Sequence, residues 1–474
     1  MPARNFVGDL VHLDVFGHHI VVLNTAQAAK DLLDGGSSIY SDRPILTMAE
    51  LSGYGDEMGM LHYNDRWRTQ RKIVAQSFNP GVVPRYYPIQ EQEGRRLIQG
   101  MLRSPDTLIS QTKTRIAAII MRVTHGYTVK GADDPMLTMQ LAAMDNFTSA
   151  SDVGSWLVDF IPQLQHLPRW MPGASFLKLA DEFKQLERRS VRTPYLWCKE
   201  RIQEGTEDPG CLVATAIRQF EAKSNEQDEA ELPWAASSGL GGGLDTVRHT
   251  ISIMMRSSKP LYQNMSTIFT FILAMLHYPH VQTKAQAEID GVVGNERLPS
   301  ITDRPSLPYV RSVIAEVYRW YPAAPQAIPH ALRQEDVYKG YLLPKSSIII
   351  PNIWGMLHDP SAFPQPEKFE PERFGYSDGE MRKVTDLLFG FGRRSCPGSH
   401  FAEGSIFAVI STILATCNVV PKIDKHGNPI IPGIDYTSGM IIIPKNLECD
   451  IKPRSTRAQK LLEDYVSRSE QHSS

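Results

Sequence analysis

The loop at residues 389–398 constrains this chain most, because it places one cysteine, Cys396, among glycines and arginines directly ahead of a long apolar segment. That segment, residues 400–419, is predicted to form a helix, so the cysteine lies beside a helix N-terminus. A helix N-terminus and neighbouring guanidinium groups lower the pKa of a thiol, and glycines let backbone amides approach the sulfur. The loop therefore suits a thiolate that binds a metal or the iron of a macrocycle. A buried cysteine without a ligand is the alternative interpretation.

Length and composition exclude several classes of protein. The chain has 474 residues with 50 basic and 52 acidic side chains, so it lacks the charge excess typical of nucleic-acid binding. Its 5 cysteines are odd in number and include no Cys-x-x-Cys pair, which predicts neither a disulfide framework nor a structural zinc site. No linker or repeat divides the chain. We therefore expect a single domain at residues 1–453, followed by a polar, disordered tail at 454–474.

The N-terminal third contains a hairpin pattern and a helix with two notable side chains. Alternation of apolar and polar residues over 11–23 predicts a β-hairpin. Residues 62–78 predict a helix on which Trp67 and Arg71, spaced i and i+4, share one face. An indole N–H beside a guanidinium suits an anionic partner, and a surface cation–π contact is the alternative.

A second predicted helix, residues 308–321, carries Glu316 and Arg319 at i and i+3. Apolar neighbours such as Val313 and Trp320 predict that this ion pair is buried, and a buried pair needs further polar partners. An exposed pair would contribute only about 0–1 kcal/mol.

A glycine-rich segment, residues 241–246, interrupts another predicted helix and ends in Asp245 and Thr246. Glycine is a poor helix former, so a helix tolerates such a segment where a kink or close approach is useful. The acid and the alcohol at that kink are suited to relaying protons.

Taken together, these motifs resemble those of the cytochrome P-450 family, whose haem-binding loop supplies a cysteine thiolate to the iron. The positions that match the loop are Phe389, Gly392, Arg394, Cys396 and Gly398. The Trp-x-x-x-Arg, Gly-x-Asp-Thr and Glu-x-x-Arg motifs occur in the family's order, and the fungal microsomal type is the most similar. The resemblance implies the cytochrome P-450 fold, which is mainly α with a small β-rich region.

The resemblance also implies a role for each matching residue. Cys396 would be the axial ligand of a haem b iron, and Asp245 with Thr246 would supply protons for O–O cleavage of dioxygen. The implied contacts of the haem propionates are Trp67, Arg71, His330 and Arg394. The implied structural triad, which retains haem by holding the cysteine loop, is Glu316, Arg319 and Arg373.

One segment departs from the family pattern. Residues 247–263 are polar and basic and contain Pro260, which breaks a helix interior. Deleting them would join Asp245 and Thr246 to the apolar helical pattern that follows. Because codons at both borders can form intron boundaries, we interpret this insertion as a translated, retained intron or a gene-model error. A genuine surface insertion is the alternative.

Apolar stretches at residues 156–162 and 167–174 are predicted to be ordinary core or a mobile roof that faces a membrane. No apolar run reaches the roughly 18 residues that span a bilayer. Membrane-bound members of the family carry an anchor helix and a proline-rich hinge ahead of the first hairpin, and neither precedes it here. The resemblance implies the cytosolic face of the endoplasmic reticulum membrane, with peripheral contact, and a soluble chain is the alternative.

The implied activity is that of a monooxygenase. It would use dioxygen and NADPH electrons, delivered by a flavoprotein reductase, to hydroxylate or otherwise oxidise an apolar small molecule. Terpenoids, steroids, polyketides and aromatic xenobiotics are the candidate substrates, in secondary metabolism or detoxification. One rival is an impaired haem-binding or misfolded product of a mis-spliced gene. Another is a haem-thiolate isomerase or dehydratase, although such enzymes tend to lack the acid–alcohol pair.

Overall fold

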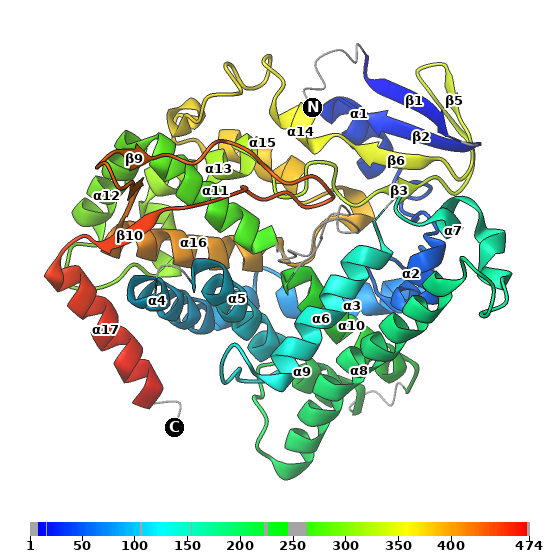
Figure 1. Cartoon of the computed structure of the whole chain (residues 1–474), viewed down its shortest axis with the longest axis horizontal. Coiled ribbons are helices and arrows are strands. Elements are labelled where there is room, and N and C mark those ends of the chain that lie inside the picture. Colours follow the sequence, from blue (N-terminus) through cyan, green and yellow to red (C-terminus); the bar gives the residue numbers. More distant parts are fainter. Residues whose placement is uncertain are drawn as a thin grey trace.

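A computed structural model describes residues 8–15, 17–104, 107–152, 154–221, 226–244 and 263–471. These residues form a mainly helical body with a small β-rich region, which confirms the predicted fold class (Figure 1). The longer helices are α3 (Asp65–Phe78), α4 (Tyr87–Arg103), α5 (Leu108–His125), α6 (Pro135–Ala150), α8 (Ser175–Glu204), α9 (Leu212–Glu221), α10 (Glu226–Leu244), α11 (Gln263–His277), α12 (Pro279–Val292), α13 (Pro308–Trp320), α15 (Asp378–Leu388), α16 (Ser399–Thr416) and α17 (Thr456–Gln471). The shorter helices are α1 (Ala26–Ala29), α2 (Thr47–Leu51), α7 (Leu157–Phe160) and α14 (Ile353–Leu357).

The largest sheet lies at the N-terminal end of the molecule and has the strand order β1-β2-β6-β3 (Figure 1). The strands of this sheet are β1 (Leu10–Val15), β2 (His18–Leu23), β6 (Ile348–Pro351) and β3 (His330–Ala331). The antiparallel pairing of β1 with β2 confirms the predicted hairpin, and β2 runs parallel to β6. Since β3 pairs with β6, the sheet fixes His330 at its inner edge.

Helix α16, which follows the cysteine loop, is the central core helix. It packs against α4, α11, α12 and α13. By length and composition this helix could cross a membrane, which corrects the expectation that no segment reaches that length. However, 72% of its apolar window is buried inside the protein. The helix ends at Thr416 rather than at residue 419, because β7 (Cys417–Val420) then pairs with β10 (Asp450–Pro453).

The C-terminal tail was expected to be disordered, and this expectation is wrong for residues 456–471, which form α17. The side chains of Leu462 and Val466, four residues apart on one helix face, are 0% and 3% exposed. On the same side of the helix, the guanidinium of Arg95 lies 4.7 Å from the ring centre of Tyr465. A narrow apolar face within a polar sequence is therefore enough to dock α17 on α4.

Helices α6, α8 and α10 lie together in one part of the molecule, where α7 also packs against α2 (Figure 1). Helix α10 ends at Leu244, and α11 begins at Gln263. Residues 245–262 lie outside the described residues. They include the predicted proton-relay residues Asp245 and Thr246 and all but the last residue of the predicted insertion at 247–263.

Candidate functional site

The cysteine loop is a tight backbone structure that depends on its glycines. It follows α15, and the backbone N–H of Cys396 donates to the carbonyl oxygen of Phe389 at 2.7 Å. Gly392 has a φ of +52°, and a Cβ at this position would lie 2.2 Å from the carbonyl oxygen of Leu33. Only glycine fits there without moving the backbone. Gly398 then occupies the N-cap position of α16, so the predicted spacing places the cysteine at that helix N-terminus.

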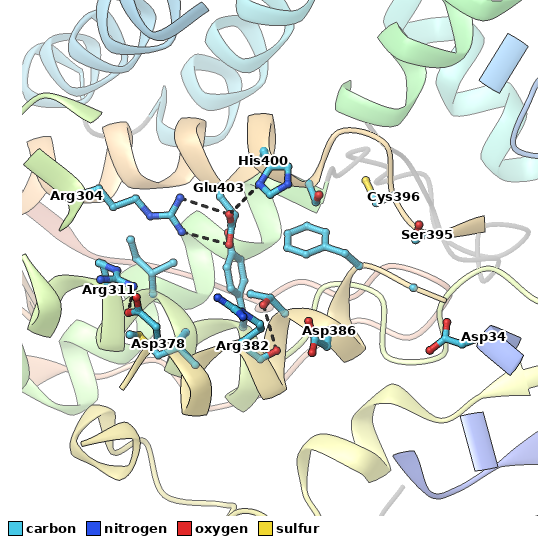
Figure 2. A pocket seen from close by; sticks show the side chains of 18 of the residues that line it. Asp34, Arg304, Arg311, Asp378, Arg382, Asp386, Ser395, Cys396, His400 and Glu403 are labelled. Carbon is cyan, nitrogen blue, oxygen red and sulfur yellow. Dashed lines mark hydrogen bonds and ion pairs between the residues drawn. The ribbon is translucent and has the colours of Figure 1, made fainter. Parts of the chain in front are cut away.

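Cys396 is solvent-accessible and lies near a partly buried cation, Arg71. Burial lowers the pKa of Arg71, and the negative charge of the Cys396 thiolate opposes that shift. Figure 2 shows Cys396 at one side of a pocket of about 1020 Å³ whose walls come from α13, α15 and α16. In this pocket Arg304 pairs with Glu403, whose carboxylate lies 3.3 Å from the guanidinium. The thiol thus borders an open pocket and lies near enough to Arg71 for the two charges to interact.

Arg394 is the best-anchored cation of the site. Its guanidinium donates to the carbonyl oxygens of Ser41, Met58 and Leu61 at 2.8, 3.0 and 2.6 Å. It also stacks over the indole of Trp67, 4.6 Å from the ring centre. Burial and the nearby positive charge of Arg43 lower the pKa of Arg394 to about 8. The predicted residues Trp67, Arg71 and Arg394 are therefore brought together.

A further cation, Arg43, was missed by sequence reasoning. Its side chain lies between three carbonyl oxygens, and the residue is 5% exposed. Burial lowers the pKa of Arg43 to about 10, although the charge of Asp42 opposes the shift. The Asp42 carboxylate is already engaged, since it lies 2.8 Å from His62 Nδ1 and accepts from the backbone N–H of Tyr63 at 3.0 Å. No sequence signal could have identified Arg43, because its partners are backbone atoms.

His330 also joins this cluster, but its hydrogen bonding restricts what it can do. Its Nδ1–H donates to the carbonyl oxygen of Tyr40 at 2.7 Å. Burial, followed by the charge of Arg43, lowers the pKa of His330 to about 3, so the ring is neutral. A neutral ring that donates through Nδ1 can only accept through Nε2. Contact with a carboxylate through Nε2 would therefore require the ring to gain a proton.

These features fit haem. Among the described residues, the buried Arg43 and the partly buried Arg71 and Arg394 concentrate positive charge, and the charge of Asp42 acts on Arg43 and Arg394. A buried excess of cations is unfavourable unless an anionic group joins it. Haem supplies two propionates for Arg71 and Arg394 and an iron atom for the adjacent thiolate.

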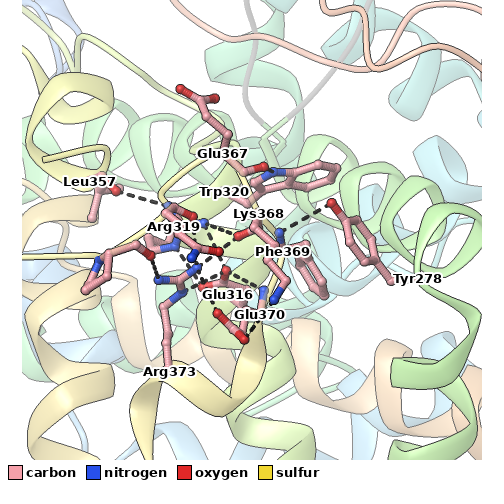
Figure 3. Close-up of polar contacts among 12 residues, drawn as sticks. Tyr278, Glu316, Arg319, Trp320, Leu357, Glu367, Lys368, Phe369, Glu370 and Arg373 are labelled. Atoms are coloured by element: carbon pink, nitrogen blue, oxygen red, sulfur yellow. Dashed lines mark hydrogen bonds and ion pairs between the residues drawn. The ribbon is translucent and has the colours of Figure 1, made fainter. Parts of the chain in front are cut away.

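The predicted triad is present (Figure 3): Glu316 and Arg319 are fully buried, and the side chain of Arg373 is 7% exposed. Arg319 donates to both carboxylate oxygens of Glu316, at 2.8 and 2.9 Å, and Arg373 donates to one of them at 3.0 Å. The backbone N–H of Glu370 adds a fourth bond at 2.8 Å. Both arginines also donate to the carbonyl oxygen of Lys368. The triad therefore fixes the segment that leads into α15 and the cysteine loop against α13.

Two buried carboxyl groups that sequence reasoning missed meet between α8 and α10. Ser238 of α10 donates to Glu57, and the backbone N–H of Met58 donates to the Ser238 oxygen at 2.9 Å. Burial raises the pKa of Glu57, whose carboxylate is hydrogen-bonded to Glu187 of α8. Burial and the charge of Glu57 raise the pKa of Glu187 well above its usual range. The hydrogen bond between the two carboxyl groups thus ties α8 to the segment that carries Met58.

Comparisons with known proteins agree with this geometry. The cytochrome P450 family model matches residues 2–257 and 264–447, with an interruption at 258–263. Cytochrome P450 monooxygenase 105 from Postia placenta is 50% identical over 96% of this chain and 84% of the relative. Cytochrome P450 monooxygenase claR from Ampulloclitocybe clavipes is 37% identical over 98% of this chain and 84% of the relative.

The fold is also shared with a solved structure. A zebra fish cytochrome P450 with progesterone superimposes with a TM-score of 0.72 at 22% identity, covering 94% of this chain and 97% of that one. Since the family model spans most of the sequence and fungal relatives match nearly its whole length, this chain belongs to the cytochrome P450 family and is a P450 monooxygenase.

Proposed function

We propose that this monooxygenase binds haem b with Cys396 as the axial iron ligand and oxidises an apolar small molecule. Its electrons would come from NADPH through a flavoprotein reductase. The observation that supports this most is the juxtaposition of a solvent-accessible thiol with Arg71, whose charge also acts on Arg394. Terpenoids, steroids, polyketides and aromatic xenobiotics are the proposed substrate classes, in secondary metabolism or detoxification.

Each side chain has a task in this proposal. When bound, haem supplies the activation of dioxygen and the transfer of one oxygen atom. Arg71 and Arg394 hold the propionates, Trp67 supports the Arg394 guanidinium, and Cys396 donates its thiolate to the iron. His330 contacts a propionate only after taking up a proton at its ring.

The remaining predicted residues deliver protons or hold the site together in this proposal. We assign proton delivery to Asp245 and Thr246, and haem retention to Glu316, Arg319 and Arg373. The reductase would approach through the pocket beside Cys396, because electrons must reach the iron. Arg382 lines this pocket from α15 and could meet an acidic partner.

We propose membrane contact for the apolar stretches at residues 156–162 and 167–174, which include α7. Leu157, Ile161 and Trp170 are 73%, 49% and 80% exposed, which is unusual for large apolar side chains in one region. Such a surface suits peripheral contact with the cytosolic face of the endoplasmic reticulum membrane. Vesicle co-sedimentation tests this contact. Trp170→Ser should reduce binding to phosphatidylcholine vesicles, and binding equal to that of the wild type would contradict the proposed membrane contact.

A carbon monoxide difference spectrum tests the function itself. Reduced, haem-loaded protein should show the Soret band of thiolate-ligated haem, and Cys396→Ala should remove it. A wild-type chain without this band would support the rival, an impaired product of a mis-spliced gene. Sequencing the transcript tests the retained-intron interpretation, which fails if every mature message contains codons 247–263.

A further inference from the structure

We propose that Arg43 is a positioning residue that sets the shape of the substrate pocket by clamping the loop at residues 324–329. This inference rests on the proposed function, because the substrate pocket belongs to that proposal and is distinct from the pocket beside Cys396. The loop leads into β3, where His330 joins the cation cluster. Arg43 would thus act through the loop backbone and touch neither substrate nor haem.

The clamp is formed by carbonyl oxygens from two distant segments. Arg43 Nε donates to the carbonyl oxygen of Gly59 at 3.0 Å. Its Nη1 donates to the carbonyl oxygens of Ile328 and Pro329 at 2.8 and 2.7 Å. One buried guanidinium therefore joins the end of the loop to the segment whose Met58 carbonyl oxygen holds Arg394.

The loop needs such a clamp because its backbone is strained. Ala327 has a φ of +49°, in the left-handed region where an alanine is strained by roughly 1–2 kcal/mol. The backbone N–H of Trp354 holds the carbonyl oxygen of Pro325 at 2.9 Å, so the loop is tied before Ala327 as well as after it. Strain of this kind persists where the surroundings impose the conformation, and such sites are often functional.

The side chain next to the strained residue is the one that the clamp positions. Ile328 is 36% exposed although it directly precedes Pro329 and the buried His330. A large apolar side chain that remains open beside the cation cluster suits contact with an apolar ligand. Because Arg43 holds the carbonyl group of Ile328 itself, a shift of the guanidinium would shift this side chain.

Arginine is required here, and lysine is not equivalent. Gly59 and the Ile328–Pro329 pair approach different edges of one planar group, which presents its donors in a fixed fork. A lysine ammonium keeps the charge that Asp42 balances, but it is a point donor on a flexible stem. The Arg43→Lys variant therefore separates the clamp from the charge.

Two iron ligands of different size provide the test. In haem-loaded protein, imidazole and 4-phenylimidazole both coordinate iron and shift the Soret band, but only the phenyl ring extends into the pocket. Arg43→Lys should weaken 4-phenylimidazole binding about tenfold and leave imidazole binding within about twofold, as expected for the loss of about 1.4 kcal/mol. The matched control is Arg333→Lys, since Arg333 lies 4.0 Å from Asp42 but is 44% exposed.

Other outcomes would overturn the clamp. Equal weakening of both ligands, or no weakening of either, would show that Arg43 does not shape the pocket. Ile328→Ala gives a second check that leaves the buried charge in place. Unchanged binding of both ligands would show that the loop does not line the pocket. If the wild type lacks the thiolate band, the proposed function fails. If the band is present but Arg43→Lys has the same ratio of 4-phenylimidazole to imidazole affinity as the wild type, only this inference fails.

Hydrogen exchange covers the case in which Arg43→Lys does not load haem. Exchange is then compared between the haem-free wild type and the haem-free variant. Faster exchange confined to peptides covering residues 323–331, with α16 unchanged, supports the clamp. Equal exchange in those peptides contradicts it.

Discussion

Replacing Glu316 by leucine should destabilise the protein strongly, because it leaves two buried guanidinium groups without their carboxylate. Glu316 accepts three bonds from Arg319 and Arg373, at 2.8, 2.9 and 3.0 Å, and the three side chains are 0%, 0% and 7% exposed. Removing one partner from a buried ion pair costs about 3–5 kcal/mol. We take about 4 kcal/mol as the expected loss of unfolding free energy.

The corresponding change in melting temperature follows from the size of the chain. With 474 residues and about 2.1 cal/mol/K per residue, the entropy of unfolding is about 1 kcal/mol/K. A loss of about 4 kcal/mol then lowers Tm by about 4 °C. Circular dichroism melts of the haem-loaded protein measure it.

An exposed ion pair with the same spacing provides the control. Lys383 and Glu380 are 2.7 Å apart with side chains 55% and 47% exposed, so Lys383→Met should lower Tm by less than about 1 °C. Haem transfer to apomyoglobin should also be faster for Glu316→Leu than for this control. The reasoning is refuted if Glu316→Leu lowers Tm no further than Lys383→Met does.

Three further predictions concern a glycine, a carboxyl group and a helix. Gly392→Ala should lower haem loading, since its φ of +52° and a Cβ 2.2 Å from the Leu33 carbonyl oxygen strain the loop; normal loading would contradict this. Burial raises the pKa of Asp159 from 3.8 to about 6. The folded protein therefore holds this proton more tightly than the unfolded chain does, so the free energy of unfolding should fall as the pH rises from 3.8 to about 6. The unfolding free energy of Asp159→Asn, measured with urea, should not show this fall with pH. Parallel pH profiles of the wild type and the variant would contradict the prediction. Leu462→Asp should speed hydrogen exchange in α17 but not in α16, and unchanged exchange in α17 would show that Leu462 does not dock it.

The parts of the site that could be predicted are those encoded by short spacings. Cys396 with its flanking glycines lies within one loop, and Glu316 with Arg319 lies within one helical turn. Such patterns depend on local geometry, which the sequence carries directly. Arg373 was found only through the family resemblance, because its partner Glu316 is 57 positions away.

The parts that were missed depend on the tertiary structure. Arg43 donates to backbone atoms 16, 285 and 286 positions away, and backbone acceptors leave no pattern in a sequence. Glu57 and Glu187 come from separate elements and meet only when α8 packs on α10. Helix α17 was missed for a different reason, since its apolar face is narrow and its composition resembles that of a disordered tail.

The contacts of Arg394 explain why its burial is unfavourable in free energy while its guanidinium is already oriented. Carbonyl oxygens of Ser41, Met58 and Leu61 orient the guanidinium, but they carry only partial charges and cannot neutralise it. The low pKa of Arg394, about 8, follows from burial and from the charge of Arg43. An anion that binds only the folded chain raises stability in proportion to its affinity. The free energy spent on burying these cations is therefore recovered on binding, and because the donors are already oriented, little further ordering is needed.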